Sequence, residues 1–463
     1  MPDAQIVPCA AADLGSRLLV LTIGFVFPTP CKDVDGLREA LYKAVKEKIP
    51  KAGARLVKRA KTFEFHIPRK FSHDVPPVAF TSSVSSSPLP TTLPPKAKDG
   101  YSKDPMFLPD EPVANLFRGP TCPKVFEDFL KPNTSVTHVH VAVYADATLI
   151  GFTTTHVAFD AHGAKLLLAA WAAATRGELD TITPSPADFV PLGLESTRQR
   201  VPKDVVLPKK QPRRGWYALN KPQTMRFISR FVMRIARDPK LTHVLIRVPK
   251  AWLEEQKVEA NAVLKERGQG DWVSTNDVLS AWMFQNVYLH RRDPTPVSFQ
   301  SPINLRALLP DVFTVPFINN AVGMVPTPPI PARTLATQPL VDTALAIRLS
   351  LNEFRKDIPT LHAELAEDAA HPARMLFPAR PGGEWAILSS WLSVKLHELD
   401  FGFGDEGAGT VRPRWVMSYV QDKSPITMRG SGSIVSEDEE AIWARWTSGS
   451  KDQKRAERAR RRL

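Results

Sequence analysis

The sequence predicts an α/β protein made of two domains of similar size. Strand-like apolar runs occur in both halves, at residues 17–28 and 242–248. Helical apolar patterns accompany them, and the clearest covers residues 251–267. Between the halves, residues 191–224 carry many Pro, Lys and Arg and few regular apolar repeats, which is typical of a linker. We therefore expect domains at 1–190 and 225–450.

The N-terminal half begins with the strand in residues 17–28, followed by a helix with an N-cap at Asp33 or Asp35. Leu37, Leu41, Ala44 and Val45 share one face of that helix. Residues 56–67 alternate loosely and predict another strand, and the Ser/Pro-rich stretch 82–98 predicts a long exposed loop.

The C-terminal half opens with the strand 242–248 and the helix 251–267. A second apolar helix is expected over 275–290, with its N-cap near Ser274. Both halves thus mix strands with helices, and a cleft between two such domains is a common place for a ligand.

Composition places the chain among ordinary globular proteins. It has 463 residues, of which 43% are hydrophobic and 24% are charged. The three cysteines have no CxxC spacing, so we expect neither a disulfide framework nor a metal site. No apolar run reaches the roughly 18 residues needed to span a bilayer. We expect a cytoplasmic protein without a membrane partner.

The formal net charge of +13 raises the question of nucleic-acid binding. Part of the excess lies in residues 451–463, where a basic tail is most simply a disordered, solvated end. Nucleic acid is therefore not the expected partner. Basic surface elsewhere would equally suit a phosphorylated ligand.

A His-x-x-x-Asp pattern, His156 to Asp160, lies where a β-rich segment gives way to the helical run 165–175. One imidazole and one carboxylate at the end of a strand are typical of a functional site. Taken alone the pattern is weak, because a buried histidine bonded to its own loop would look the same.

A second motif, Asp400-Phe401-Gly402-Phe403-Gly404, makes the pattern specific. Together the two motifs resemble the BAHD acyltransferase family, whose DFGWG signature has Trp where this chain has Phe403. Further matches follow in the family's order, in the stretches Pro50–Leu56, Ser274–Trp282, Asn304–Arg306, Phe317–Ala321 and Ser389–Trp391.

The resemblance covers nearly the whole chain and implies a chloramphenicol acetyltransferase-like fold. In that fold two pseudo-equivalent domains with mixed sheets and flanking helices enclose a channel that holds the active site. It also implies acyl-CoA as a co-substrate, no permanently bound cofactor, a small hydroxylated or amine acceptor, and a monomeric enzyme.

The sequence departs from the family pattern after Asp160. The family usually has Gly there, whereas Ala161 and His162 precede Gly163, so the turn is expected to differ. In having alanine, Ala161, directly after the motif's Asp, the chain resembles fungal members of the family. Thr155 stands where the related condensation domains of peptide synthetases have a second His, which argues against that class.

The chemistry of acyl transfer needs a base, because an alcohol is too weak an acid to attack a thioester at neutral pH. A neutral histidine, with an ordinary pKa of about 6.5, suits this, and we expect His156 to take the proton. The thiol of coenzyme A leaves readily, so no acyl-enzyme is needed. The resemblance implies that Asp160 instead pairs with Arg306, although a direct His–Asp relay is an alternative.

The resemblance also implies Trp391 and Ser389 as donors to the oxyanion, although both could belong to the core. It gives Asp400, Gly402 and Gly404 a structural role away from the substrate. For coenzyme A, Ser274 and Thr275 at a helix N-terminus could meet a phosphate. The linker side chains Lys209, Lys210, Arg213 and Arg214 could do so by charge, or could simply be solvated.

The leading hypothesis is an acyl-CoA-dependent transferase. An idle family member that binds or regulates is the alternative, and a condensation-type domain acting on carrier-protein thioesters is less favoured. The sequence identifies neither the acceptor nor the acyl chain.

Overall fold

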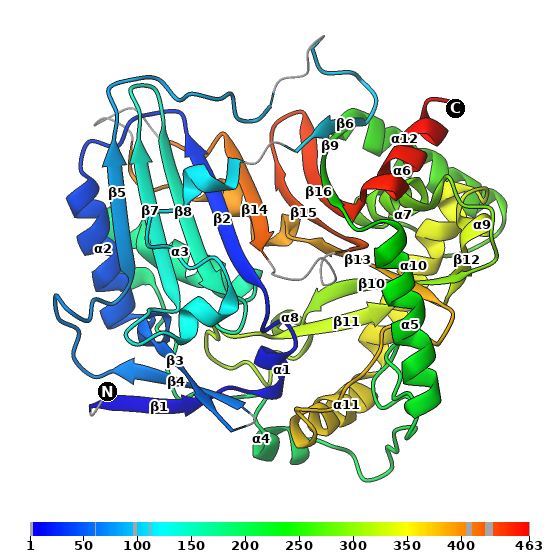
Figure 1. Cartoon of the computed structure of the whole chain (residues 1–463), viewed down its shortest axis with the longest axis horizontal. Coiled ribbons are helices and arrows are strands. Elements are labelled where there is room, and N and C mark those ends of the chain that lie inside the picture. Colours follow the sequence, from blue (N-terminus) through cyan, green and yellow to red (C-terminus); the bar gives the residue numbers. More distant parts are fainter. Residues whose placement is uncertain are drawn as a thin grey trace.

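The computed structural model describes residues 3–60, 62–95, 100–110, 113–403, 410–421 and 429–462. Two large sheets dominate it, one in each half of the molecule, with helices packed around them (Figure 1). Both sheets contain parallel and antiparallel neighbours. The expected α/β class with mixed sheets is therefore confirmed.

The sheet of the N-terminal half has five strands in the order β14-β2-β8-β7-β5. Their bounds are β2 Val20–Phe27, β5 Ala79–Val84, β7 Thr137–Val143, β8 Thr148–Thr155 and β14 Trp415–Gln421. All neighbours are antiparallel except β5 and β7. The predicted strand within 17–28 is β2.

The sheet of the C-terminal half has eight strands, with β12 paired beside the path β11-β10-β13-β15-β16-β9-β6. Their bounds are β6 Met106–Pro109, β9 Leu241–Pro249, β10 Pro296–Asn304, β11 Val322–Pro326, β12 Ile330–Pro331, β13 Glu384–Ser390, β15 Ser431–Glu437 and β16 Ala441–Gly449. The strands β10, β13 and β15 run parallel.

A small third sheet has the order β1-β4-β3, with bounds Ala4–Pro8, Thr62–Pro68 and Arg55–Arg59. The single strand expected over 56–67 is wrong, because the chain turns back between β3 and β4 and the two pair antiparallel.

The main helices surround the sheets, and several match the sequence patterns. Their bounds are α1 Ala11–Leu14, α2 Val34–Glu47, α3 Ala161–Thr175, α4 Leu194–Arg198, α5 Lys221–Arg237, α6 Lys250–Glu266, α7 Thr275–Tyr288, α8 Leu305–Leu308, α9 Ala332–Leu335, α10 Leu340–Lys356, α11 Ile358–Ala370 and α12 Ser450–Arg460. The predicted caps are present, since Asp33 accepts from Gly36 N and Ser274 from Asp277 N. Among the described residues, no helix combines the length and the apolar character that crossing a bilayer requires.

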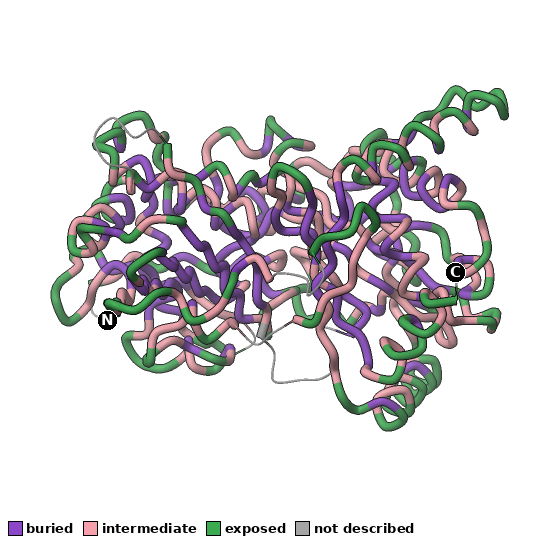
Figure 2. The backbone as a smooth tube through the Cα atoms, turned by 90° about the horizontal axis from the view of Figure 1, so that it is seen from above, coloured by how far each residue is buried: buried purple, intermediate pink, exposed green. Residues whose placement is uncertain are grey.

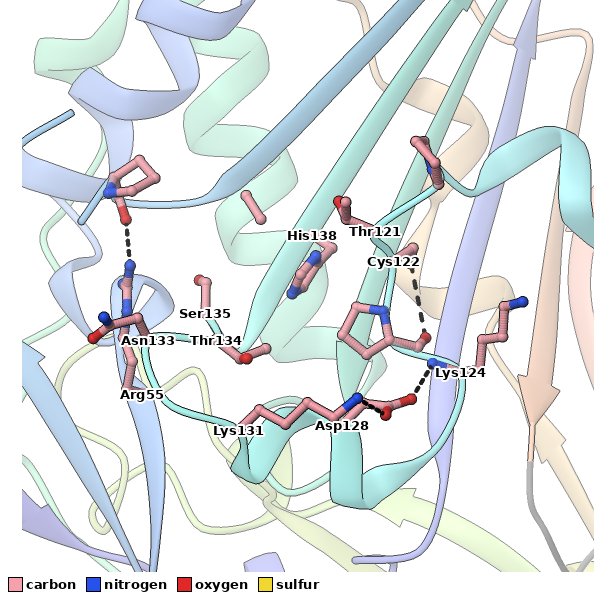
Figure 3. Close-up of a pocket in the computed structure, with 14 residues that line it drawn as sticks. Arg55, Thr121, Cys122, Lys124, Asp128, Lys131, Asn133, Thr134, Ser135 and His138 are labelled. Carbon is pink, nitrogen blue, oxygen red and sulfur yellow. Dashed lines mark hydrogen bonds and ion pairs between the residues drawn. The ribbon is translucent and has the colours of Figure 1, made fainter. Parts of the chain in front are cut away.

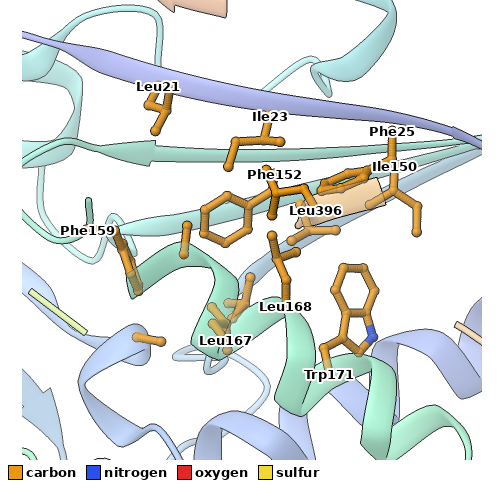
Figure 4. Packing of buried hydrophobic residues seen from close by; sticks show 14 of the residues in the cluster. Leu21, Ile23, Phe25, Ile150, Phe152, Phe159, Leu167, Leu168, Trp171 and Leu396 are labelled. Carbon is orange, nitrogen blue, oxygen red and sulfur yellow. The ribbon is translucent and has the colours of Figure 1, made fainter. Parts of the chain in front are cut away.

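The core of the N-terminal half lies between its sheet and α3. Every residue of β2 and β8 is buried, because helices and loops cover both faces of these central strands. Leu21, Ile23 and Phe25 of β2 meet Leu168 and Trp171 of α3 (Figure 4). The buried stretches follow the sheets through both halves (Figure 2). Each half thus has a core of its own.

The expected boundaries do not separate the two sheets cleanly. β6, from the N-terminal half of the sequence, pairs with β9 in the C-terminal sheet. In return, β14 pairs with β2 in the N-terminal sheet. Each half therefore completes its sheet with a strand from the other.

The two remaining segments are more ordered than the sequence suggested. Residues 191–224 contain α4 and the start of α5, and Tyr217 pairs with Phe377 through the backbone. The expected disordered tail is wrong, because residues 450–460 form α12. Ala456 is buried there, and the Arg460 guanidinium lies 3.6 Å from the Phe107 ring centroid. Packing of this kind holds a helix that composition alone would leave solvated.

Candidate active site

His156 lies at the end of β8, at the junction of the two halves. The last pair of the β2–β8 ladder joins Val20 and Thr155, and the His156 backbone N–H donates to Leu19 O at 2.9 Å. The backbone of this residue is thus held by the sheet. Its ring, half-buried, reaches toward the segment between α8 and β11, which belongs to the C-terminal half.

The imidazole is oriented by Asn320. His156 Nδ1 lies 3.1 Å from Asn320 Oδ1. The Asn320 amide N–H groups donate to the carbonyls of His156 and Val157 and to Asp13 Oδ1, at 2.9–3.2 Å. Because these partners are acceptors, the amide nitrogen faces them and Oδ1 faces the ring. A carbonyl oxygen only accepts, so in the neutral imidazole the proton sits on Nδ1 and Nε2 keeps its lone pair.

Asp13 anchors this arrangement from the short helix α1. It is buried, and its Oδ1 accepts from both the backbone and the side-chain nitrogen of Asn320 at 3.1 Å. Burial raises the pKa of Asp13, while the nearby Lys51 ammonium and the Asn320 bonds oppose the shift. No local sequence pattern indicated a role for Asp13 or Asn320, although Asn320 lies in one of the stretches that match the family.

Asp160 forms the ion pair with Arg306 that the resemblance implied. The guanidinium donates to both carboxylate oxygens, at 2.9 and 3.1 Å, and also to Phe317 O at 2.9 Å. The remaining capacity of the carboxylate is taken by backbone N–H groups of Gly163 and Ala321, at 2.8 and 2.9 Å. A buried carboxylate that accepts four such bonds from three residues joins the start of α3 to the C-terminal half.

Gly163 lies in a tightly packed place. Its backbone has no positive φ, so the conformational freedom of glycine is not needed there. A Cβ at this position would lie 1.7 Å from Ile318 O. The glycine therefore lets the segment that carries Asn319 and Asn320 approach the first turn of α3.

Ser389 and Trp391 lie at the end of β13 in the C-terminal sheet. The Trp391 indole N–H donates to Ser389 Oγ at 3.0 Å, and its backbone N–H donates to Ile434 O at 2.7 Å. The indole is buried and packs with the N-terminal core. Its N–H is thus already used, whereas the hydroxyl proton of Ser389 remains able to donate.

The Asp400 motif lies at the opposite end of α3 from His156. Arg176, the C-cap of α3, donates to Asp400 O, and Phe401 packs on Trp171 at 4.8 Å between ring centroids. Gly402 adopts a φ of +70°, which favours glycine. A helix of 15 residues is about 22 Å long. Gly404 lies outside the described residues.

Ser274 and Thr275 begin α7, but the Ser274 hydroxyl is engaged within the cap. It donates to Asp277 Oδ2 at 2.7 Å, and the same carboxylate pairs with Arg348. The N-terminus of α7 therefore carries a buried carboxylate beside Ser274. The phosphate contact expected at Ser274 and Thr275 stays a prediction.

The linker cations divide into two kinds. Lys209 and Lys210 are exposed. Arg213 lies 3.4 Å from Asp368, and Arg214 pairs with Glu364 at 2.9 Å, so these two attach the linker to α11. Arg213 and Arg214 are thus already paired with carboxylates, whereas Lys209 and Lys210 form no ion pair with any described residue. The contact of Lys209 and Arg213 with coenzyme A stays a prediction.

A pocket of about 490 Å³ lies apart from this site (Figure 3). His138 and Arg55 contribute to its wall, near the starts of β5 and β7. The C-terminal half instead adjoins the β14 edge of the sheet, where Ser418 meets Ser433 of β15 at 3.4 Å. The pocket is thus separate from the junction that holds His156.

Comparison with known proteins decides the family. The model of the Transferase family matches residues 134–429, which is more than half of the chain. This chain belongs to the Transferase family. The predicted membership of the BAHD acyltransferases is therefore confirmed.

The similar curated proteins carry names of two kinds. Acetyltransferase adrJ of Penicillium roqueforti is 26% identical over 424 residues, covering 87% of this chain and 82% of its own. Transcriptional regulator calD of Penicillium decumbens is 26% identical over 434 residues, covering 86% and 82%. The family therefore includes curated relatives with an enzymatic name and with a regulatory name.

The fold is shared with solved structures. TRI101 of F. sporotrichioides, crystallised with coenzyme A and T-2, matches with a TM-score of 0.67 at 16% identity, over 98% of this chain and 97% of that chain. The expected two-domain fold of the family is thereby confirmed.

Proposed function

We propose that this chain transfers an acyl group from a coenzyme A thioester to a hydroxyl, or an amine, of a small metabolite, with His156 as the general base. The observation that carries the proposal is the bond from His156 Nδ1 to Asn320 Oδ1. In the neutral ring this bond leaves Nε2 with the free lone pair that a base needs.

The reaction then proceeds in two steps. Nε2 takes the proton of the acceptor hydroxyl as its oxygen attacks the thioester carbonyl and the C–O bond forms. The tetrahedral intermediate collapses with cleavage of the C–S bond, and the imidazolium returns the proton to the departing thiolate. The acyl group passes directly to the acceptor, so no acyl-enzyme forms.

The oxyanion of the intermediate is stabilised by Ser389 in this proposal. Because Trp391 Nε1 donates to Ser389 Oγ at 3.0 Å, the hydroxyl is oriented and its own proton is available. A donor of this kind contributes about 3 kcal/mol to the transition state. Asp160 and Arg306 act only by holding the loop of His156 in place.

The relatives support the choice of donor. Acetyltransferase adrJ carries its donor class in its name, and the matched TRI101 crystal contains coenzyme A. We therefore propose acetyl-CoA as the first donor to test. Lys209 is an exposed cation in the linker and a candidate contact for the phosphates.

The experiment measures thiol release from a panel of acyl-CoAs with mixed hydroxylated metabolites. Wild-type protein should release thiol only when an acceptor is present. His156→Ala should lower the rate by about 10² to 10⁴. His73→Ala, at an exposed histidine, is the matched control and should leave the rate unchanged. Equal release by wild-type and His156→Ala proteins would contradict the proposal.

A second function is favoured by the relative named a transcriptional regulator. In that case the fold would bind a ligand or partner without turnover. It predicts no acceptor-dependent thiol release from any acyl-CoA, and folding of the His156→Ala variant would be unaffected. The same panel therefore separates the two functions.

A further inference from the structure

The helix α5, Lys221–Arg237, is attached to the protein by one of its faces. The Phe227 and Phe231 rings lie 5.6 and 5.3 Å from the Trp385 ring, measured between centroids. Arg234 on the same side pairs with Glu384 at 2.8 Å. Figure 1 shows α5 along the outside of the C-terminal half. The opposite face of the helix is therefore turned outward.

That outward face is apolar, although it is exposed. Met225 is 67% exposed, Ile228 42%, Val232 53% and Met233 46%. The spacings of three and four residues place Met225, Ile228 and Val232 on one side of the helix, and Met233 lies at the edge of that side. Isolated exposed apolar side chains are ordinary, but a contiguous group on a single helix indicates a surface that is covered in use.

Cations border this apolar face. Arg226, Arg230 and Arg237 are exposed, and at 100° per residue they fall on one flank of the helix. The helix contains no acidic residue. Lys451 Nζ donates to Arg237 O at 2.6 Å, so the basic helix α12 continues the charge beyond the end of α5.

We propose that the outward face of α5 docks on an anionic membrane surface. Met225, Ile228 and Val232 would enter the boundary between headgroups and acyl chains, while the arginines meet lipid phosphates. Charge complementarity favours a membrane as the partner, because the positive charge of the arginines matches the negative charge of an anionic phospholipid surface. A second copy of the chain fits poorly, since pairing two such helices would bring like charges together. The proposal is independent of the acyl transfer proposed above.

Co-sedimentation with vesicles tests the proposal. Full-length protein should bind vesicles of phosphatidylcholine with phosphatidylserine, and should bind pure phosphatidylcholine much more weakly. The double variant Ile228→Ser and Val232→Ser should weaken binding about tenfold. Arg226→Gln should weaken it about fivefold and reduce its dependence on salt. Val258→Ser, at an exposed valine of α6, is the matched control and should bind as wild type does.

All substituted side chains are exposed, so the variants should melt at the wild-type temperature, and this is checked first. Failure of the wild-type protein to bind the anionic vesicles at low salt would overturn the proposal and favour an acidic protein partner. Unchanged binding of the Ile228→Ser and Val232→Ser variant would overturn it as well, because attraction by the cations of α12 alone would then explain the result.

Discussion

At the scale of single residues, the side chain of Asn320 decides what His156 can do. Its carbonyl oxygen accepts from Nδ1, and its amide nitrogen is fixed by three acceptors, among them Asp13. The tautomer follows from this orientation. The motif predicted His156 and Asp160, and the family resemblance implied the pairing with Arg306, but neither gave a sign of how the imidazole is held.

Replacing Asn320 with Ala should separate catalysis from binding. The ring loses its Nδ1 partner and can rotate or adopt the other tautomer, so kcat should fall about ten- to hundredfold, while KM for the thioester stays the same. Steady-state kinetics measure both constants. Asn286→Ala is the control, because among the described residues the Asn286 side chain bonds only to Trp282 O, within α7. An unchanged kcat would show that Asn320 does not orient the base.

His138 predicts how stability depends on pH. It is 8% exposed, and burial lowers its pKa to about 4, below the ordinary value of about 6.5. Between these values the unfolded chain binds more protons than the folded one, so the free energy of unfolding rises with pH. Stability should therefore fall as the pH drops from about 6.5 to about 4, by up to about 3 kcal/mol for this group.

Urea denaturation at several pH values checks this. His138→Gln should flatten the pH dependence, whereas His73→Gln, at a fully exposed histidine, should follow the wild-type curve. If the wild type and His138→Gln gave parallel curves, the buried imidazole would not be the source of the dependence. His243, whose pKa burial also lowers to about 4, would account for the remaining slope.

At the scale of elements, α3 connects the two motifs of the sequence. Asp160 caps its start and Arg176 closes its end against Asp400. Phe401 packs on Trp171 near that end, which leaves the second motif far from the base. The helix therefore explains why a string as recognisable as the second motif supports the scaffold in our proposal and takes no part in the chemistry.

Gly163→Ala tests the close approach at the first turn of α3. The added Cβ would overlap Ile318 O, so the neighbouring segment must shift, and we expect a loss of about 1–3 kcal/mol of stability. Activity should fall as well, because Asn320 moves with that segment. Gly270→Ala meets nothing within 4 Å and is the matched control. Denaturant titration of both variants gives the comparison, and equal stabilities would contradict the packing role.

Two elements differ from their sequence patterns for the same physical reason. The tail 451–463 looked solvated, and 221–224 looked like the end of a linker. In the structure, both segments form helices that bury a side chain against the rest of the protein. Ala456 is the buried residue of α12, and Phe227 is the buried residue of α5. A single buried contact of this kind stabilises a helix whose composition is otherwise polar or basic, and composition cannot reveal the partner surface.

At the scale of the whole molecule, the two halves are joined by exchanged strands. β6 completes the C-terminal sheet and β14 the N-terminal one. The ion pair of Asp160 with Arg306 adds a link at the site. Neither half keeps its full sheet without the other.

We therefore expect the chain to unfold in one cooperative step. Denaturation followed by tryptophan fluorescence and by far-ultraviolet circular dichroism should give coincident transitions. Tryptophans such as Trp171 and Trp446 lie in separate cores, so fluorescence reports on both halves. Two resolved transitions would show that the exchanged strands do not couple them.

The sequence by itself determined the family, the α/β class, and the positions of His156, Asp160 and Arg306, because these depend on local patterns and on motifs in a fixed order. The tertiary structure decided how the base is oriented and which groups are already engaged. Asn320 bonds to His156 although the two residues are 164 positions apart in the sequence, and the Ser274 hydroxyl donates to Asp277. Such contacts depend on how distant segments pack in three dimensions, and no local pattern encodes them.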